Sequence, residues 1–186
     1  MLKVFALIVL TCGVVAAQNT NSSTPQRPRT ANTNRSQDPG SDGVLAAFNT
    51  LLDGIRHANV DEVTSVYWNN PRLNMFNYNG SVTKGWEQVR KNRASSYPEI
   101  KDVKLEVRDV SVTMMGTTGA IVTCLWTQSQ TYKGAPETVS GRMTLVFKRA
   151  NNAWKAIHLH SSPDNPNPAV VPPSERPSPS PTPTPL

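Results

Sequence analysis

The sequence predicts an α+β domain in which helices come first and long antiparallel strands follow. From Val44 onward, apolar residues recur at the spacing of helical turns, whereas from Lys101 onward they alternate with polar residues, as in strands. Residues 18–40 and 163–186 are poor in apolar residues and are not expected to join a core. These three observations define a single domain between two tails.

The first residues have the pattern of a secretory signal. Lys3 precedes the apolar run Val4–Leu10, and the small residues Val15-Ala16-Ala17 place a cleavage site before Gln18. The run is too short to span a bilayer, and no other segment is a candidate span. Residues 1–17 are therefore predicted to be removed from a secreted or periplasmic protein, with a retained anchor or a buried strand as the alternative.

Residues 18–40 are predicted to be a disordered linker, because Asn, Thr, Ser and Pro dominate them. Residues 163–186 are predicted to be a disordered, Pro/Ser/Thr-rich tail whose end favours an extended, left-handed helix. The domain is expected over residues 41–162. The whole chain has a formal net charge of +6, which is a modest excess, and it contains no polybasic run. Both observations argue against nucleic acid as a partner.

Cysteine usage leaves no intramolecular disulfide in the mature protein. Cys12 falls within the predicted signal, so Cys124 is the remaining thiol. Because Cys124 lies in the apolar run Ala120–Trp126, it is expected to be a small buried hydrophobic residue.

Three helices are expected. The first is capped by Ser41 or Asp42 and places its apolar stripe inward. The second is shorter, begins at Asn59 or the residues beside it and ends before Asn69-Asn70-Pro71, with Val60, Val63, Val66 and Tyr67 facing inward. The third runs over 85–97 and is closed by Pro98. The apolar stripe of the first helix consists of Val44, Leu45, Phe48, Leu51, Leu52 and Ile55.

Strands fill the remainder of the domain. Two short ones, 74–78 and 81–83, flank the hairpin turn Asn79-Gly80. The long ones are expected at 101–115, 120–132, 137–148 and after a turn at residues 150–153. In the first long strand the apolar residues change from odd to even positions near Arg108-Asp109, which predicts a β-bulge and a bent strand.

The last two strands bring polar side chains to one face. Alternation places Arg142 and Thr144 on one face of their strand, and Trp154, Ala156, His158 and His160 on one face of the next. The pattern Arg142-x-Thr144 followed by Trp154-x-x-Ile157-His158-x-His160-Ser161 resembles the closing strands of SnoaL-like domains of the NTF2-like superfamily. Within it, the stretch is most similar to the association domain of calmodulin-dependent protein kinases and to small bacterial domains related to it.

This resemblance implies an NTF2-like cone, in which a strongly bent antiparallel sheet wraps around about three N-terminal helices. The superfamily hosts enzymes, ligand binders and oligomerisation modules. Related association domains have a cationic pocket within the cone, which implies a small anionic organic ligand. No cofactor and no metal are expected.

The predicted ligand site combines these residues. Arg142, His158 and His160 would contact the ligand with Thr144 beside them, Arg90 and Arg93 would add positive charge, and Trp86, Tyr97 and Trp126 would form apolar walls. In the alternative interpretation, Arg90 and Arg93 extend to solvent and Arg142 pairs with a carboxylate such as Asp53 or Glu87.

Two other functions stay open at this point. His158 or His160 could act as a general acid or base with Arg142 stabilising an oxyanion, as an isomerase, cyclase or hydrolase would need, although no carboxylate falls in a catalytic motif. A zinc ion on the two histidines would need a third ligand from elsewhere. A pure assembly scaffold is the third possibility, since apolar residues on both faces of the long strands predict a homo-dimer or larger homo-oligomer.

Overall fold

The computed structural model describes residues 40–165; the predicted signal, most of the predicted linker and nearly all of the Pro-rich tail lie outside these residues. The described elements, in chain order, are α1 (Asp42–Arg56), α2 (Val60–Val66), β1 (Asn74–Phe76), β2 (Val82–Lys84), α3 (Trp86–Ser96), η1 (Tyr97–Glu99), β3 (Ile100–Met115), β4 (Gly119–Tyr132), β5 (Ala135–Ala150) and β6 (Ala153–Pro163). Each expected helix and strand is present, with ends shifted by a few residues. No helix in this part of the chain is long and apolar enough to cross a membrane.

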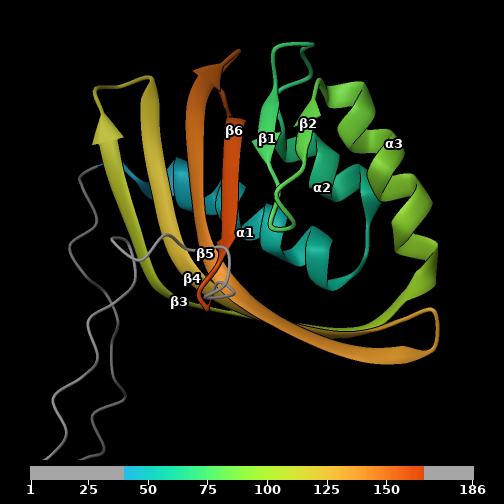
Figure 1. Cartoon of the computed structure of the whole chain (residues 1–186). Helices are drawn as coiled ribbons and strands as arrows, with labels where there is room; N and C mark the ends of the chain where they lie inside the picture. Colours follow the sequence, from blue (N-terminus) through green and yellow to red (C-terminus); the bar gives the residue numbers. More distant parts are fainter. Residues whose placement is uncertain (1–39, 166–186) are drawn as a thin grey trace, which may run out of the picture. The chain divides into compact units, whose positions relative to one another are not determined.

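The six strands form one sheet in the order β2-β1-β6-β5-β4-β3. Figure 1 shows this sheet curving around the helices, with the long strands β3, β4 and β5 bent beneath them. The α+β cone expected from the sequence is confirmed. One neighbouring pair, β1 and β6, is parallel, a pairing that the sequence pattern did not predict.

Bulges explain the curvature of the sheet. The pairing of β3 with β4 shifts register between Arg108 and Ser111, where Asp109 has a φ of 53°, as the change of apolar parity predicted. A second shift lies between Lys101 and Lys104, with Asp102 at a φ of 55°. Each extra residue bends the strand and increases its twist, so that one face of the sheet becomes concave.

The helices fill this concave face with apolar side chains. Phe48 and Leu51 of α1 and Val63 of α2 are completely or almost completely buried, together with Leu145 and Phe147 of β5. The apolar stripe of α1 therefore packs as its spacing predicted.

Cys124 belongs to the same core. It is a free thiol with 5% of its surface exposed. Burial raises the pKa of the Cys124 thiol to about 11, so the side chain stays protonated at neutral pH.

The last strand departs from the simple alternation expected for it. Val146 pairs with His158 but Phe147 pairs with Ala156, so Ile157 is an extra residue on β6. Ala156 is consequently buried on the core side, with Trp154 on the same face, while His158 and His160 face the other side. The prediction that Trp154 and Ala156 share a face with the two histidines is therefore wrong.

Candidate functional site

A cavity of about 480 Å³ lies between the helices and the concave face of the sheet. The β1–β2 hairpin supplies part of its wall, α3 and η1 another part, and β4 a third. The lining residues are Ile55, Tyr67, Met75, Asn77, Tyr78, Asn79, Ser81, Thr83, Val89, Asn92, Arg93, Ser96, Tyr97, Ile100, Leu105, Trp126, Gln128, Gln130, Met143, Leu159 and Ser161. Its size is within the range of cavities that hold small organic molecules.

Three hydrogen-bond donors of the lining have no partner. The Tyr67 hydroxyl, the Tyr97 hydroxyl and the Trp126 indole nitrogen are all buried without a hydrogen bond. The side chains themselves are 2%, 5% and 9% exposed, respectively. Since buried polar groups in native proteins are nearly always satisfied, three unsatisfied donors in one cavity need an explanation.

Arg93 is the one charged side chain among the lining residues. Its guanidinium carbon lies 5.5 Å from the centre of the Tyr97 ring, in a cation–π arrangement. It forms no ion pair with any described carboxylate. The cavity therefore carries a positive charge that no acidic side chain of its wall offsets.

Both tyrosines stay protonated at neutral pH. Burial raises the pKa of Tyr67 to about 12, and the neighbouring Arg93 cation opposes this increase only in part. Burial likewise raises the pKa of Tyr97, again against the effect of Arg93. No hydrogen bond of good geometry joins Arg93 to the Tyr67 hydroxyl, although the two groups lie close enough to interact.

The packing of β4 on β5 fixes the position of Trp126. Trp126 is opposite Gly141 in the β4–β5 register. A side chain at Gly141 would begin 3.0 Å from Cζ2 of Trp126 and would collide with the Ser162 carbonyl, so only glycine leaves room for the indole. The indole also meets Tyr78 of the hairpin edge-to-face, with 5.5 Å between ring centroids.

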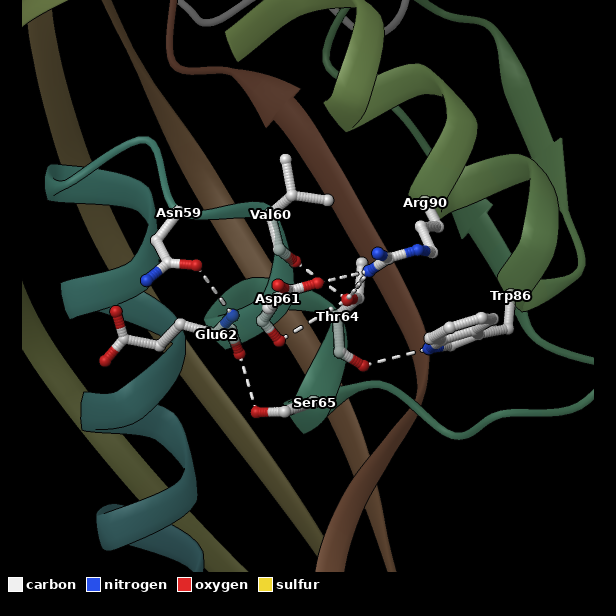
Figure 2. A network of polar contacts seen from close by, with 8 residues as sticks. All are labelled: Asn59, Val60, Asp61, Glu62, Thr64, Ser65, Trp86 and Arg90. Carbon is white, nitrogen blue, oxygen red and sulfur yellow. Dashed lines mark hydrogen bonds and ion pairs between the residues drawn. The ribbon is translucent and has the colours of Figure 1, made fainter.

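A polar network holds α2 against α3 beside the cavity (Figure 2). The Trp86 indole nitrogen donates to the Thr64 carbonyl at 2.9 Å, and Arg90 pairs with Asp61 at 2.6 Å. At the start of α2, the Asn59 side chain accepts a hydrogen bond from the Glu62 amide and so caps the helix. Because α2 leads into Tyr67 and α3 carries Arg93, this network sets the distance between those two groups.

Amides form a further part of the wall. Gln128 donates to Gln130 at 2.6 Å, and Gln130 donates in turn to Glu137. On the hairpin side, the Asn77 side chain donates to Thr83 at 2.9 Å. These neutral groups make part of the lining polar without adding charge.

Three of the predicted site residues line the cavity: Arg93, Tyr97 and Trp126. Trp86 and Arg90 belong to the network behind it, and Trp86 also lines a separate groove with Trp68 and Lys155. For Arg90, neither predicted role describes its contact, because it pairs with Asp61 across two helices.

The other four predicted residues lie on the opposite, outer face of the sheet. Thr144 pairs with His160 and Arg142 with Ser162, while the buried Met143 between them lines the cavity. The structure thus brings Arg142, Thr144, His158 and His160 to one face, but not to the cavity. Ligand contact by these four residues stays a prediction.

This outer face has contacts of its own. Phe76 lies edge-on to both histidine rings, at 5.2 Å from His158 and 5.7 Å from His160 between centroids. The Nδ1 atom of His158 is 2.9 Å from the Asn74 carbonyl oxygen. Arg142 donates to the Asp164 carbonyl rather than to Asp53, which pairs with Arg56. Among residues 40–165, no group of three or more histidine, cysteine or carboxylate side chains could hold a metal ion.

Sequence reasoning did not single out Tyr67 or the β1–β2 hairpin as parts of the site. Tyr67 was expected to face inward from the second helix, which is correct, but an inward tyrosine is indistinguishable in sequence from a core residue. The position of the hairpin against the cavity depends on the parallel pairing of β1 with β6, which brings residues 74–76 beside residues 158–160.

Solved structures with this fold are numerous. A candidate calcium/calmodulin-dependent protein kinase II association domain from Xanthomonas campestris is 21% identical with a TM-score of 0.59, covering 69% of this chain and 92% of its own. A ketosteroid isomerase-like protein from Erwinia carotovora atroseptica is 14% identical with a TM-score of 0.59, covering 69% and 99%. An NTF2-like superfamily protein from Salmonella enterica serovar Typhimurium is 18% identical with a TM-score of 0.60, covering 66% and 89%. At such identities the likeness concerns the fold.

None of the curated proteins matches the sequence. The family model of the SnoaL-like domain does match, over residues 44–166, which is the region of the cone and its cavity. The match covers most of the chain and agrees with the fold shared with the solved structures. The chain belongs to the SnoaL-like domain family.

Proposed function

We propose that this chain is a secreted or periplasmic, homo-oligomeric module that binds a small anionic organic molecule in the cavity of the cone. One observation carries the proposal: three buried donors without partners line the same cavity as Arg93, and no acidic side chain lines it. A ligand with oxygen acceptors would satisfy the donors, and a negative charge on it would balance the guanidinium.

Binding is favoured over catalysis by the composition of the wall. Acid–base chemistry needs a group that titrates near neutral pH within reach of the substrate. No aspartate, glutamate or histidine is among the lining residues, and both lining tyrosines with a raised pKa are poor bases at neutral pH. His158 and His160 are on the outer face. Solved structures with the same fold include proteins described as ketosteroid isomerase-like and as a candidate dehydratase. Any ligand that binds should therefore also be tested for turnover.

The oligomeric part of the proposal concerns the outer face. Phe76 is 41% exposed and Val82 is 52% exposed, and the two residues pair across β1 and β2. Exposed apolar side chains beside aromatic and imidazole rings are a natural contact for a second copy.

A thermal-shift screen of the full chain tests the binding proposal. The compounds are small carboxylates, steroids, aromatic polyketide-like molecules and their neutral analogues. We expect the melting temperature to rise with ligand concentration for at least one anionic class. A folded protein whose melting temperature responds to none of these classes would contradict the proposal.

Tyr67→Phe serves as the matched variant for this screen, because it removes only the unpartnered hydroxyl. The increase in melting temperature produced by a ligand should be smaller in Tyr67→Phe.

The proposed location is tested by N-terminal sequencing of protein secreted by a bacterial host. The mature sequence should begin at Gln18, and an intact Met1 in the secreted fraction would contradict cleavage there.

A further inference from the structure

We infer that the ligand is a monocarboxylate with a flat apolar body, whose carboxylate lies against Arg93 and the hydroxyls of Tyr67 and Tyr97. The inference rests on the proposed function and specifies the chemical class of the ligand. It follows from the balance of charge, the geometry of the donors and the composition of the remaining wall.

Charge balance selects a single negative charge. Arg93 is the one charged lining residue, and the other polar lining side chains are amides, hydroxyls and an indole. A monoanion would neutralise the guanidinium. A dianion, such as a phosphate monoester, would leave a negative charge in the cavity without a partner, which is costly.

The donors match the acceptors of a carboxylate. A guanidinium presents parallel N–H groups that fit two carboxylate oxygens, and each of those oxygens has a further lone pair for another donor. The hydroxyls of Tyr67 and Tyr97 are two such donors, and Arg93 is close to both tyrosines. Water can satisfy the hydroxyls, whereas an anion also balances the charge of Arg93.

The remaining wall indicates the body of the ligand. Apolar side chains from α1, α3 and four strands line it, among them Ile55, Met75, Val89, Leu105, Met143 and Leu159. Trp126 and Tyr78, held edge-to-face, add aromatic surface that a flat ring can contact by stacking or by its edge. The third unpartnered donor, the Trp126 indole nitrogen, can then donate a hydrogen bond to a polar substituent of the ligand or to a carboxylate oxygen.

Three ligands of one shape separate the possibilities. We would titrate the full chain at pH 7.5 by isothermal calorimetry with 2-naphthoate, 2-naphthamide and 2-naphthyl phosphate, which carry one, no and about two negative charges. The expected order is naphthoate first, with the amide and the phosphate each at least about tenfold weaker.

Variants locate the carboxylate. Arg93→Gln should weaken naphthoate binding about 10- to 100-fold while changing naphthamide binding little, because only the anion uses the charge. Tyr97→Phe preserves the ring and its packing, so it tests the same contact if Arg93→Gln does not fold. Lys91→Gln is the matched control, since Lys91 is an exposed cation on the same helix that does not line the cavity.

The outcomes are distinct for the two proposals. Equal binding of naphthoate and naphthamide, or tighter binding of the phosphate, would overturn the carboxylate inference and leave the small-molecule proposal standing. An equal loss of naphthoate binding in Arg93→Gln and Lys91→Gln would also overturn it, because the effect would then be one of general charge. Absence of naphthoate binding overturns the inference, and the broader thermal-shift screen then decides the proposed function by itself.

Discussion

At the scale of single residues, Tyr67 connects α2 with the sheet and lines the cavity. Its backbone follows α2 and forms a bridge with Ala156 of β6, while its hydroxyl reaches the cavity without a hydrogen bond. A hydroxyl left unsatisfied in this way lowers the stability of the free protein. A ligand in the cavity that accepts a hydrogen bond from the Tyr67 hydroxyl would remove this cost.

The raised pKa of Tyr67 predicts a loss of stability at alkaline pH. Because the pKa is about 12 in the folded protein and 10.0 ordinarily, the unfolded chain releases this proton first, and the contribution is complete below pH 10 and lost as pH rises towards 12. At pH 11 the loss from this one group should be about 1.4 kcal/mol. Urea unfolding between pH 8 and pH 11 measures it, and in Tyr67→Phe the decrease should be smaller by that amount. Parallel pH profiles of the two proteins would contradict the assignment.

The close approach of Gly141 to Trp126 and Ser162 predicts a loss of stability on substitution. In Gly141→Ala the new methyl group would meet the Ser162 carbonyl and the Trp126 ring, so β5 and β6 must separate or the indole must move. We expect a decrease of about 1–3 kcal/mol in the free energy of unfolding, together with a shifted tryptophan emission of the folded state. Gly134→Ala is a comparison without crowding, because nothing lies within 4 Å of a side chain there, although its φ of 83° adds strain. A larger emission change in Gly134→Ala would contradict the positioning role.

At the scale of elements, α2 is short and depends on its ends. It has seven residues, too few to be stable as an isolated helix, and its first turn is closed by the Asn59 side chain. Its acidic first turn also pairs with α3 through Asp61 and Arg90. The cap therefore contributes to the position of Tyr67 as well as to the helix.

Asn59→Ala should lower the free energy of unfolding by about 1 kcal/mol, since the Glu62 amide loses its acceptor. Chemical denaturation measures this loss, and Asn59→Asp, which keeps an oxygen acceptor, should restore most of it. Ser65→Ala, on the exposed side of α2, is the control and should change stability by less. A similar loss in Ser65→Ala and Asn59→Ala would contradict a specific capping role.

The turn between β5 and β6 offers the opposite change, a stabilising one. Asn151 and Asn152 have φ values of 50° and 62°, so both occupy the left-handed region, which asparagine tolerates better than most residues. Asn152→Gly removes the strain of a side chain in that region and should be neutral or stabilising by up to about 1 kcal/mol. Asn152→Ala should instead cost about 1 kcal/mol. Thermal unfolding of both variants tests the order, and a more stable alanine variant would contradict it.

Parity arguments explain what the sequence could and could not predict about these elements. The change from Val107 to Val110 on β3 revealed a bulge because apolar residues stood on both sides of it. The extra residue Ile157 on β6 left no such signal, since Ile157 and Leu159 continue a regular apolar pattern. Bulges are visible in a sequence only where they displace an apolar series.

At the scale of the whole molecule, the fold was predictable, and the cavity on the inner face was predictable only in part, through Arg93, Tyr97 and Trp126. Strands with apolar side chains on both faces do not indicate which face will be concave. The polar residues Arg142, His158 and His160 were predicted to contact the ligand, but they lie on the outer face. Tyr67 was missed because it resembles an ordinary core residue, and Tyr97 was expected only as an apolar wall, although the hydroxyls of both are buried without partners. Burial without satisfaction is a property of the three-dimensional structure and has no counterpart in residue spacing.

The separation of the two faces leads to the last prediction. If copies associate through the outer face, Phe76→Asp should dissociate them, because a carboxylate in an apolar contact loses its hydration without gaining a partner. Analytical ultracentrifugation should show a defined oligomer for the unaltered chain and a shift to monomer for the variant. Since Phe76 does not line the cavity, naphthoate binding per chain should stay the same.

Met115→Asp is the matched control for that experiment. Met115 is 46% exposed, similar to Phe76, but lies at the end of β3, at the opposite edge of the sheet. An oligomer that survives Met115→Asp but not Phe76→Asp would place the contact around the outer histidines. Loss of the oligomer in both variants would indicate a contact over the whole outer face, and a monomeric unaltered chain would remove the oligomer from the proposed function while leaving the cavity and its ligand unaffected.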